Sequence, residues 1–299
     1  GKIFDNRSVD NFKDKPSWSV PFISQRNLRF SDGYSFPANG FYQSDEIRAK
    51  VSQLRQEGIS KGISESGLNK YTTDIFKPPY ESADVPDGAY VDGAIANRSL
   101  ELIDNMDTSQ PFFLAVGFVR PHMPFVAPTK YWDLYDRDKI ELSPIPDKPK
   151  NAPNQAWHQS GELREWYDGI PDVPDRWIDN VPLDIAKILR HGYYAATSYA
   201  DAQMGKVLNA LDRLNLSENT VIIFTGDHGF SLGDHTLWNK HSLFTLATQS
   251  PLIIRKPGGE MNKSVPGVVE YLDIYPTVTE LANLPRPEHL EGESLANTL

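Results

Sequence analysis

Three runs of apolar residues predict buried β-strands at 112–119, 220–225 and 252–254. The first run follows Pro111, the second is rich in β-branched residues, and the third follows Pro251. In these runs apolar residues occupy consecutive positions instead of alternating with polar ones. Because such a strand needs apolar surroundings on both faces, the pattern favours a parallel sheet.

Helical periodicity occurs before or after each predicted strand. Apolar residues recur at helical spacing over 90–106, about 183–214 and 272–284, and an amphipathic stretch lies at 46–56. Alternation of helices and strands predicts an α/β fold with a doubly wound, mostly parallel central sheet flanked by helices. Sheets usually have about five or six strands. Because the sequence offers fewer convincing ones, we expect the sheet to be incomplete in this chain.

The segment 144–182 is rich in proline, tryptophan and aspartate, and it predicts a long ordered loop. In α/β folds, long loops beyond the carboxyl ends of parallel strands commonly determine which substrate is bound. We therefore predict that residues 144–182 form a specificity loop.

The chain of 299 residues has a formal net charge of −10. It contains no basic run of the kind that binds nucleic acid, so nucleic acid is not an expected partner. An acidic protein that binds an anion needs a small local cluster of positive groups. The absence of cysteine excludes disulfides, zinc–thiolate sites and thiol nucleophiles from these residues. No run approaches the roughly 20 apolar residues of a membrane-spanning helix.

Asp227 and His228 follow the predicted strand at 220–225 and stand between Gly226 and Gly229. In α/β folds, the carboxyl end of a buried strand faces the crevice where ligands bind. A carboxylate and an imidazole suit a hard or borderline divalent cation, which makes the pair a candidate metal site. In the alternative interpretation, Asp227 caps a helix that begins at Gly229 and His228 packs in the interior.

Two further residues can supply positive charge beside an anion. His122 follows the first predicted strand between Pro121 and Pro124, and a histidine so held can donate to an oxyanion or to a leaving-group oxygen. Lys240 ends a polar, turn-rich stretch, which Asp234 is expected to support, and it could neutralise a bound oxyanion. The alternatives are a histidine packed among apolar residues and an ordinary solvated lysine.

Taken together, these segments resemble the sulfatase family of the alkaline phosphatase superfamily, and within it the branch that includes iduronate-2-sulfatase. The likeness covers nearly the whole chain, and the ordered combination of motifs is far more specific than any one motif. The motifs are Gly1-Lys2-Ile3-Phe4, 111–117, Arg120-Pro121-His122-Met123-Pro124-Phe125, 193–211, 224–229, Trp238-Asn239-Lys240 and 271–277.

The resemblance implies a sulfuric ester hydrolase whose substrate is a sulfated carbohydrate, such as a glycosaminoglycan. It implies one Ca²⁺ ion, with Asp227 and His228 among its ligands. It assigns Lys2, His122 and Lys240 to sulfate binding and catalysis, which supplies the local positive cluster that an acidic protein needs. The family's nucleophile is a formylglycine made from Cys or Ser in a Cys/Ser-x-Pro/Ala-x-Arg motif, and the metal stabilises charge on the sulfate and the nucleophile.

The chain departs from the family pattern at several points. It contains no residue in the formylglycine motif and lacks the paired aspartates that complete the family's metal site, both of which belong upstream of Lys2. Asp5 stands where the resembled branch has a histidine. We therefore expect 1–299 to be a partial sulfatase catalytic domain, without the nucleophile segment and the C-terminal subdomain, and inactive by itself.

Two alternatives stand beside the sulfatase hypothesis. A phosphodiesterase or phosphonate hydrolase of the same superfamily would use two metal ions about 4 Å apart, and a non-catalytic relative would bind sulfated glycans in the same crevice. The sulfatase hypothesis predicts that Lys2, His122, Asp227, His228 and Lys240 converge on one crevice. Since relatives of this kind are usually exported, a periplasmic, extracellular or lysosomal location is expected.

Overall fold

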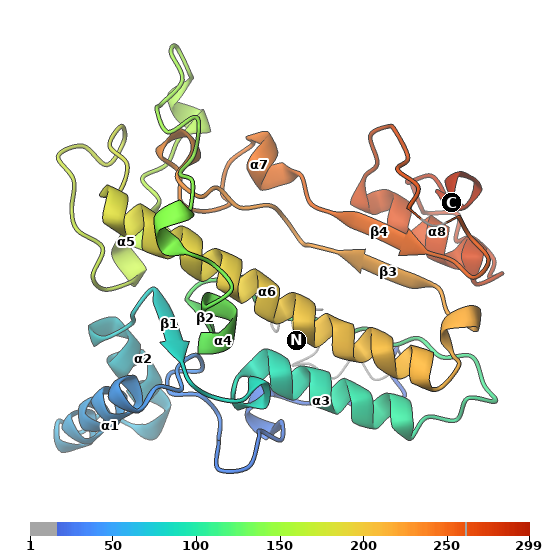
Figure 1. Cartoon of the computed structure of the whole chain (residues 1–299), viewed down its shortest axis with the longest axis horizontal. Coiled ribbons are helices and arrows are strands. Elements are labelled where there is room, and N and C mark those ends of the chain that lie inside the picture. Colours follow the sequence, from blue (N-terminus) through green and yellow to red (C-terminus); the bar gives the residue numbers. More distant parts are fainter. Residues whose placement is uncertain (1–16, 261) are drawn as a thin grey trace. The chain divides into compact units, whose positions relative to one another are not determined.

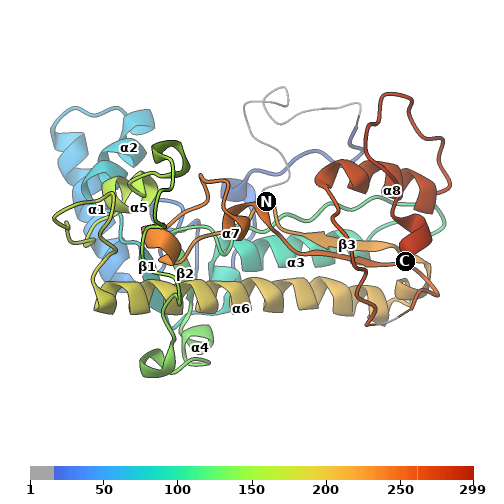
Figure 2. The same ribbon diagram turned by 90° about the horizontal axis from the view of Figure 1, so that it is seen from above.

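The computed structural model describes residues 17–260 and 262–299. The chain divides into two compact units. The first unit contains 17–210 together with Phe230–Ala247, and the second contains Leu211–Gly229 together with Thr248–Leu299. Figures 1 and 2 show the elements of both units in two views.

Helices dominate the first unit, whereas the described part of the second unit contains one pair of strands and one helix besides short helical turns. The first unit holds the strands β1 (Tyr80–Ala83) and β2 (Phe125–Pro128) and the helices α1 (Asp45–Ser60), α2 (Glu65–Ile75), α3 (Val91–Asp104), α4 (Thr129–Trp132), α5 (Gly161–Trp166) and most of α6 (Leu183–Arg213). The short helix α7 (Thr245–Thr248) ends where the second unit resumes, and that unit holds β3 (Ile222–Thr225), β4 (Leu252–Arg255) and α8 (Ile274–Leu281). Within the described residues, none of the helices combines the length and the apolar character needed to cross a bilayer.

The predicted helices at 46–56, 90–106 and 183–214 are confirmed by α1, α3 and α6, and α8 covers the middle of 272–284. Local sequence explains where α1 begins, since the Ser44 hydroxyl accepts a hydrogen bond from the Ile47 N–H. Acidic residues in its first turn interact favourably with the helix dipole.

The helices α1 and α2 pack against each other in the first unit (Figure 2). Gly58 permits this close packing, because a Cβ atom at that position would lie 2.8 Å from Cδ2 of Leu68. Val51, Leu54 and Leu68 are buried between the helices or beneath them. A side chain at position 58 would therefore require the side chains of Leu68 and Tyr71 to shift.

The strands predicted at 220–225 and 252–254 are confirmed as β3 and β4, but they pair antiparallel, with Ile223 opposite Ile254. The parallel arrangement expected for them is therefore wrong. Exposure alternates along β4, where Ile253 is 61% exposed. An apolar run indicates burial, whereas strand direction depends on how the chain returns to the sheet, which the run itself does not encode.

A parallel pair occurs in the first unit, where sequence analysis predicted no strand. β1 and β2 align Tyr80 with Phe125 and Ala83 with Pro128, and all four residues of β2 are buried. Each strand has only four residues, which is too short for a periodic pattern to emerge. We predicted an incomplete, mostly parallel sheet. The described residues form one short parallel pair of strands and one antiparallel pair.

The apolar run at 112–119 forms no strand in the described part of the chain, which corrects the prediction made for it. Phe113 is 74% exposed, whereas Val116, Phe118 and Val119 pack against the buried apolar residues of α3. Within the described residues, the second half of the run is thus covered by side-chain packing and not by pairing with a neighbouring strand. Periodicity alone cannot distinguish these two situations.

The helix α6 contributes to two buried clusters of the first unit. Ala195 and Tyr199 belong to a cluster with β2 and α4, whereas Ala186 and Leu189 belong to a cluster that includes Trp238. The helix α6 therefore contacts both the cluster that contains Tyr199 and the cluster that contains Trp238.

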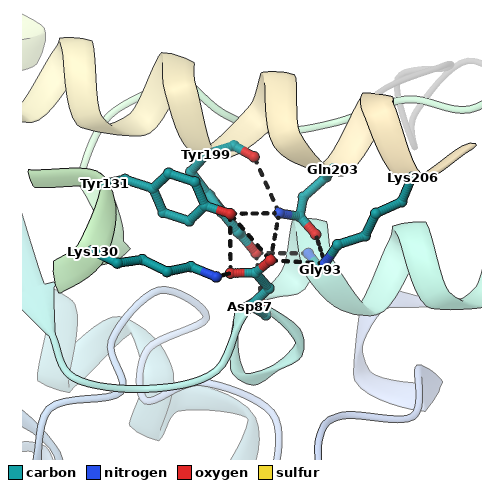
Figure 3. Close-up of polar contacts among 7 residues, drawn as sticks. All are labelled: Asp87, Gly93, Lys130, Tyr131, Tyr199, Gln203 and Lys206. Carbon is teal, nitrogen blue, oxygen red and sulfur yellow. Dashed lines mark hydrogen bonds and ion pairs between the residues drawn. The ribbon is translucent and has the colours of Figure 1, made fainter. Parts of the chain in front are cut away.

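The carboxylate of Asp87 joins α4 and α6 (Figure 3). It lies 2.7 Å from the ammonium of Lys130 and 2.8 Å from that of Lys206, and it accepts a hydrogen bond of 3.2 Å from Gln203. Burial raises the pKa of Asp87, but the hydrogen bonds from the two lysines outweigh burial and lower the pKa to about 2. The charged carboxylate is therefore the form that the folded state stabilises.

We predict that Asp87→Asn destabilises the first unit at pH 7 by about 2 kcal/mol. A carboxyl group whose pKa falls on folding stabilises the folded state above its unfolded pKa of about 4. This contribution is lost as the pH falls toward the folded pKa of about 2, so the difference from wild type should shrink over that range. Urea unfolding followed by circular dichroism at stepped pH measures the effect. The exposed neighbour Asp84 provides the control Asp84→Asn, and equal stability of Asp87→Asn and wild type at pH 7 would contradict the prediction.

Candidate functional site

The segment that carries His122 is fixed from within the first unit by two buried charged residues. The carboxylate of Asp92 accepts the backbone N–H groups of Val119 at 2.8 Å and Arg120 at 2.7 Å. The guanidinium of Arg120 donates to the carbonyl oxygens of His122 and Pro124. Burial raises the pKa of Asp92, and the positive charge of Arg120 opposes that rise. These contacts hold the backbone on both sides of the imidazole.

The imidazole of His122 is oriented by acceptors on both nitrogens. Nδ1 lies 2.6 Å from the carbonyl oxygen of Met123, and Nε2 lies 3.7 Å from Oε1 of Glu162. The contact of Nδ1 is a hydrogen bond, whereas the distance of 3.7 Å from Nε2 to Glu162 is an electrostatic contact and too long for a hydrogen bond. The side chain is 31% exposed, so a ligand can reach it, and the fully packed histidine of the alternative interpretation is not observed.

Glu162, on α5, connects His122 to Lys240. The Lys240 ammonium donates to Oε2 of Glu162, and their side chains are only 14% and 5% exposed. Burial raises the pKa of Glu162, but the hydrogen bond and charge of Lys240, together with the charge of His122, lower it below its usual value. Lys240 is therefore a mostly buried, paired residue, and the alternative of an ordinary solvated lysine is wrong.

Sequence analysis missed Glu162, because it lies within 144–182 on a helix of six residues that leaves no periodic signal. Tertiary contacts bring it to Lys240. The Ser160 hydroxyl accepts a hydrogen bond of 3.0 Å from the backbone N–H of Trp238, and the indole N–H of Trp238 donates to Oδ1 of Asn180 at 2.5 Å. The predicted specificity loop is thus ordered around a buried tryptophan from another part of the chain.

The stretch before Lys240 is supported by Asp234, as expected. The Asp234 carboxylate accepts hydrogen bonds from the Ser143 hydroxyl at 2.6 Å and from the Leu232 N–H at 3.0 Å. The backbone N–H of His235 donates to the carbonyl of Ile145 at 2.7 Å. These bonds attach the beginning of the 144–182 segment to the stretch that leads to Lys240.

A cleft of about 220 Å³ opens beside Glu162 in the first unit. Burial lowers the pKa of His158, which borders this cleft, and the positive charge of His241 lowers it further. The imidazole of His158 is therefore neutral at pH 7. The residues around the cleft combine hydrogen-bonding groups with one large aromatic side chain: His158, Gly161, Glu162, Glu165, Trp166, Asn239 and His241.

Asp227 and His228 follow β3 in the second unit. Nδ1 of His228 lies 2.7 Å from the carbonyl oxygen of Gly229, and Nε2 lies 3.7 Å from Oδ2 of Asp227. A proton on Nδ1 leaves the Nε2 lone pair beside a carboxylate oxygen, and two electron-pair donors so placed suit a shared divalent cation. No helix begins at Gly229 in the described structure, so the interpretation of Asp227 as a helix cap is wrong.

The pair fits a divalent ion only as part of a larger ligand set, since Ca²⁺ takes six to eight oxygen ligands. Among the described residues, no group of three or more His, Cys, Asp or Glu side chains could hold a metal ion. Lys2 lies outside the described residues. The structure brings His122 and Lys240 together in the first unit, whereas Asp227 and His228 belong to the second. The predicted convergence of all five side chains stays a prediction.

Comparison with known proteins gives a consistent family assignment. The sulfatase family model matches residues 21–284. Iduronate 2-sulfatase from Mus musculus is 35% identical over 241 residues, which cover 70% of this chain and 43% of that protein. The Homo sapiens iduronate 2-sulfatase is 36% identical over 212 residues, which cover 68% of this chain and 38% of that protein. The resemblance seen in the sequence is confirmed, and the chain spans less than half the length of these curated relatives.

Solved structures also share the fold. A phosphonate monoester hydrolase from Silicibacter pomeroyi superposes with a TM-score of 0.58 at 23% sequence identity, and the match covers 83% of this chain and 49% of that one. This likeness confirms the predicted α/β, alkaline-phosphatase-like fold class. At such low identity it concerns the fold alone.

We predict that Lys240→Met destabilises the first unit by about 3 kcal/mol at pH 7, because it leaves the buried Glu162 carboxylate without its hydrogen-bonded cation. The folded pKa of Glu162 is lowered, so the contribution of the pair is present above the unfolded pKa of about 4 and is lost as the pH falls. The difference between variant and wild type should therefore shrink below about pH 4. Urea unfolding of both proteins at several pH values provides the measurement.

Lys139→Met is the matched control for Lys240→Met. The Lys139 side chain is 84% exposed and pairs with Asp136 at the surface, so its loss should cost no more than about 0.5 kcal/mol. Equal effects of the two substitutions would show that burial adds nothing to the pair of Glu162 and Lys240.

Proposed function

Because the chain belongs to the sulfatase family, we propose that it takes part in hydrolysing sulfate esters of a glycosaminoglycan or another sulfated polysaccharide. The observation that carries the proposal is the pairing of His122 and Lys240 on the buried carboxylate of Glu162. His122 and Lys240 thus place two basic side chains close together in a chain whose net charge is −10. The name of the relatives that are 35% and 36% identical, iduronate 2-sulfatase, supports a sulfated sugar as substrate.

Under this proposal, the two positive groups bind and orient the sulfate. The Lys240 ammonium lies against sulfate oxygens and offsets the charge that develops on them during ester cleavage. His122 holds a proton at Nε2 and donates it in a hydrogen bond to a sulfate or ester oxygen. Glu162 contacts both groups and fixes their positions, so little reorganisation is needed when the substrate binds. Family resemblance adds Lys2 to the same group.

The proposal assigns Ca²⁺ to Asp227 and His228 as part of a larger ligand set. When bound, the ion would stabilise negative charge on the sulfate as a Lewis acid. The 299 residues include no Cys or Ser in the family's nucleophile motif, so the proposal assigns the formylglycine nucleophile to a residue outside them. An exported location, where sulfated polysaccharides are encountered, belongs to the same proposal.

A phosphonate hydrolase is the main alternative, because a solved enzyme of that kind shares the fold. Two positive groups also attract a phosphonate or phosphate ester. The sequence relatives at 35% and 36% identity are sulfatases, however, whereas the likeness to the phosphonate hydrolase is 23% and concerns the fold. We therefore favour sulfate as the anion.

We predict that the chain binds a sulfated disaccharide but not the same disaccharide without sulfate, and that His122→Gln weakens binding about tenfold. The variant loses a charge-assisted hydrogen bond, and a tenfold change corresponds to about 1.4 kcal/mol. Isothermal titration calorimetry on the full chain measures both affinities. The exposed His289 gives the matched control His289→Gln, which should bind like wild type.

The same titrations distinguish the alternatives. Tighter binding of a phosphonate monoester than of any sulfated sugar would favour the phosphonate hydrolase. Equal affinity for the sulfated and unsulfated disaccharides would contradict both the sulfatase proposal and the sulfated-glycan binder.

A further inference from the structure

The cleft beside Glu162 carries an aromatic side chain for which sulfate binding has no use. Trp166 is the last residue of the helix α5, which Figure 1 labels. Its side chain borders the cleft and is 59% exposed. Ligand pockets are commonly lined by aromatic side chains together with a few well-placed polar groups. An indole offers a broad, flat and apolar surface that loses little conformational entropy on binding.

His158 borders the same cleft and carries a ring nitrogen without a hydrogen-bond partner among the described residues. Its Nδ1 accepts the backbone N–H of Ser160 at 3.0 Å, so in the neutral ring the proton is on Nε2. Nε2 is buried and has no hydrogen-bond partner in the described part of the chain. A buried donor without an acceptor is costly, which makes this N–H ready to bind an acceptor atom of a ligand.

The remaining features of the cleft limit what fits. Glu165 adds a carboxylate acceptor beside the indole of Trp166. The volume of about 220 Å³ is below the roughly 300–1,000 Å³ of pockets that hold drug-sized ligands. The cleft therefore suits a small ring with hydroxyl groups and one apolar face, and it is too small to enclose an oligosaccharide.

We propose that this cleft binds the pyranose ring that carries the sulfate ester, with Trp166 against the apolar face of the ring, His158 donating to a ring or hydroxyl oxygen, and Glu165 accepting from a hydroxyl. This inference rests on the proposed function. Glu162 both borders the cleft and binds Lys240, so a ring in the cleft lies next to the cation assigned to its sulfate. Trp166, His158 and Glu165 then determine which sugar is accepted.

The test separates recognition of the sugar from recognition of sulfate. The full chain is titrated with glucosamine 6-sulfate, with iduronate 2-sulfate and with inorganic sulfate. One of the two sulfated sugars should bind wild type more tightly than the other. We expect Trp166→Ala to lower the affinity for that sugar about tenfold, the size expected when a stacking contact is lost. Its affinity for inorganic sulfate should stay within about twofold of wild type, because that anion reaches only the cationic groups.

Two further variants make the result specific. Trp177→Ala, which removes a tryptophan that is 42% exposed in the same 144–182 segment but does not border the cleft, should change neither affinity. His158→Phe keeps an aromatic ring at this position but removes the free N–H. It should also lower the affinity for the sugar, but not the affinity for inorganic sulfate.

The outcomes distinguish the subsite from the proposed function. Unchanged sugar affinity in both Trp166→Ala and His158→Phe, with normal sulfate binding, overturns the subsite and leaves the proposed function standing. If Trp166→Ala lowers the affinities for the sugar and for inorganic sulfate equally, the subsite is also overturned, because Trp166 would then act on the anion site. If wild type binds none of the probes, the proposed function fails and the subsite fails with it.

Discussion

The candidate site depends on one buried carboxylate. Glu162 is removed from water in a chain that is already acidic, and such a charge is tolerated only when cations and hydrogen bonds compensate it. Lys240 and His122 provide that compensation, and in doing so they acquire fixed positions. The same interaction therefore stabilises the fold and brings together the two basic side chains on which the proposed function depends.

Two other carboxylates with little solvent exposure have a related role elsewhere in the first unit. Asp87 binds Lys130 and Lys206, and Asp92 binds the backbone of the segment that carries His122. Each joins residues that are far apart in the sequence. Because a buried charge strongly disfavours any arrangement in which its partners are absent, such contacts specify the positions of connecting segments that short strands and loops would otherwise leave loosely defined.

The two candidate pairs of functional residues belong to different units of the chain. The proposed anion-binding residues His122 and Lys240 lie in the first unit, and the candidate metal ligands Asp227 and His228 lie in the second. Each pair is organised by its own neighbours, through Glu162 in one case and through the carbonyl of Gly229 in the other. The local geometry of each pair is therefore consistent with its proposed role independently of the other.

The sequence by itself determined the fold class, the long helices and the family, because helical periodicity and ordered motifs are local properties that survive without knowledge of partners. It also proposed His122 and Lys240 as site residues, but it did not reveal that both contact Glu162. Strand direction in β3 and β4, the lack of strand pairing at 112–119 and the position of Glu162 were decided only by the tertiary structure. The physical reason is the same in each case. Pairing between strands, and compensation of a buried charge, depend on groups brought together from distant parts of the chain, and neither leaves a periodic trace in the local sequence.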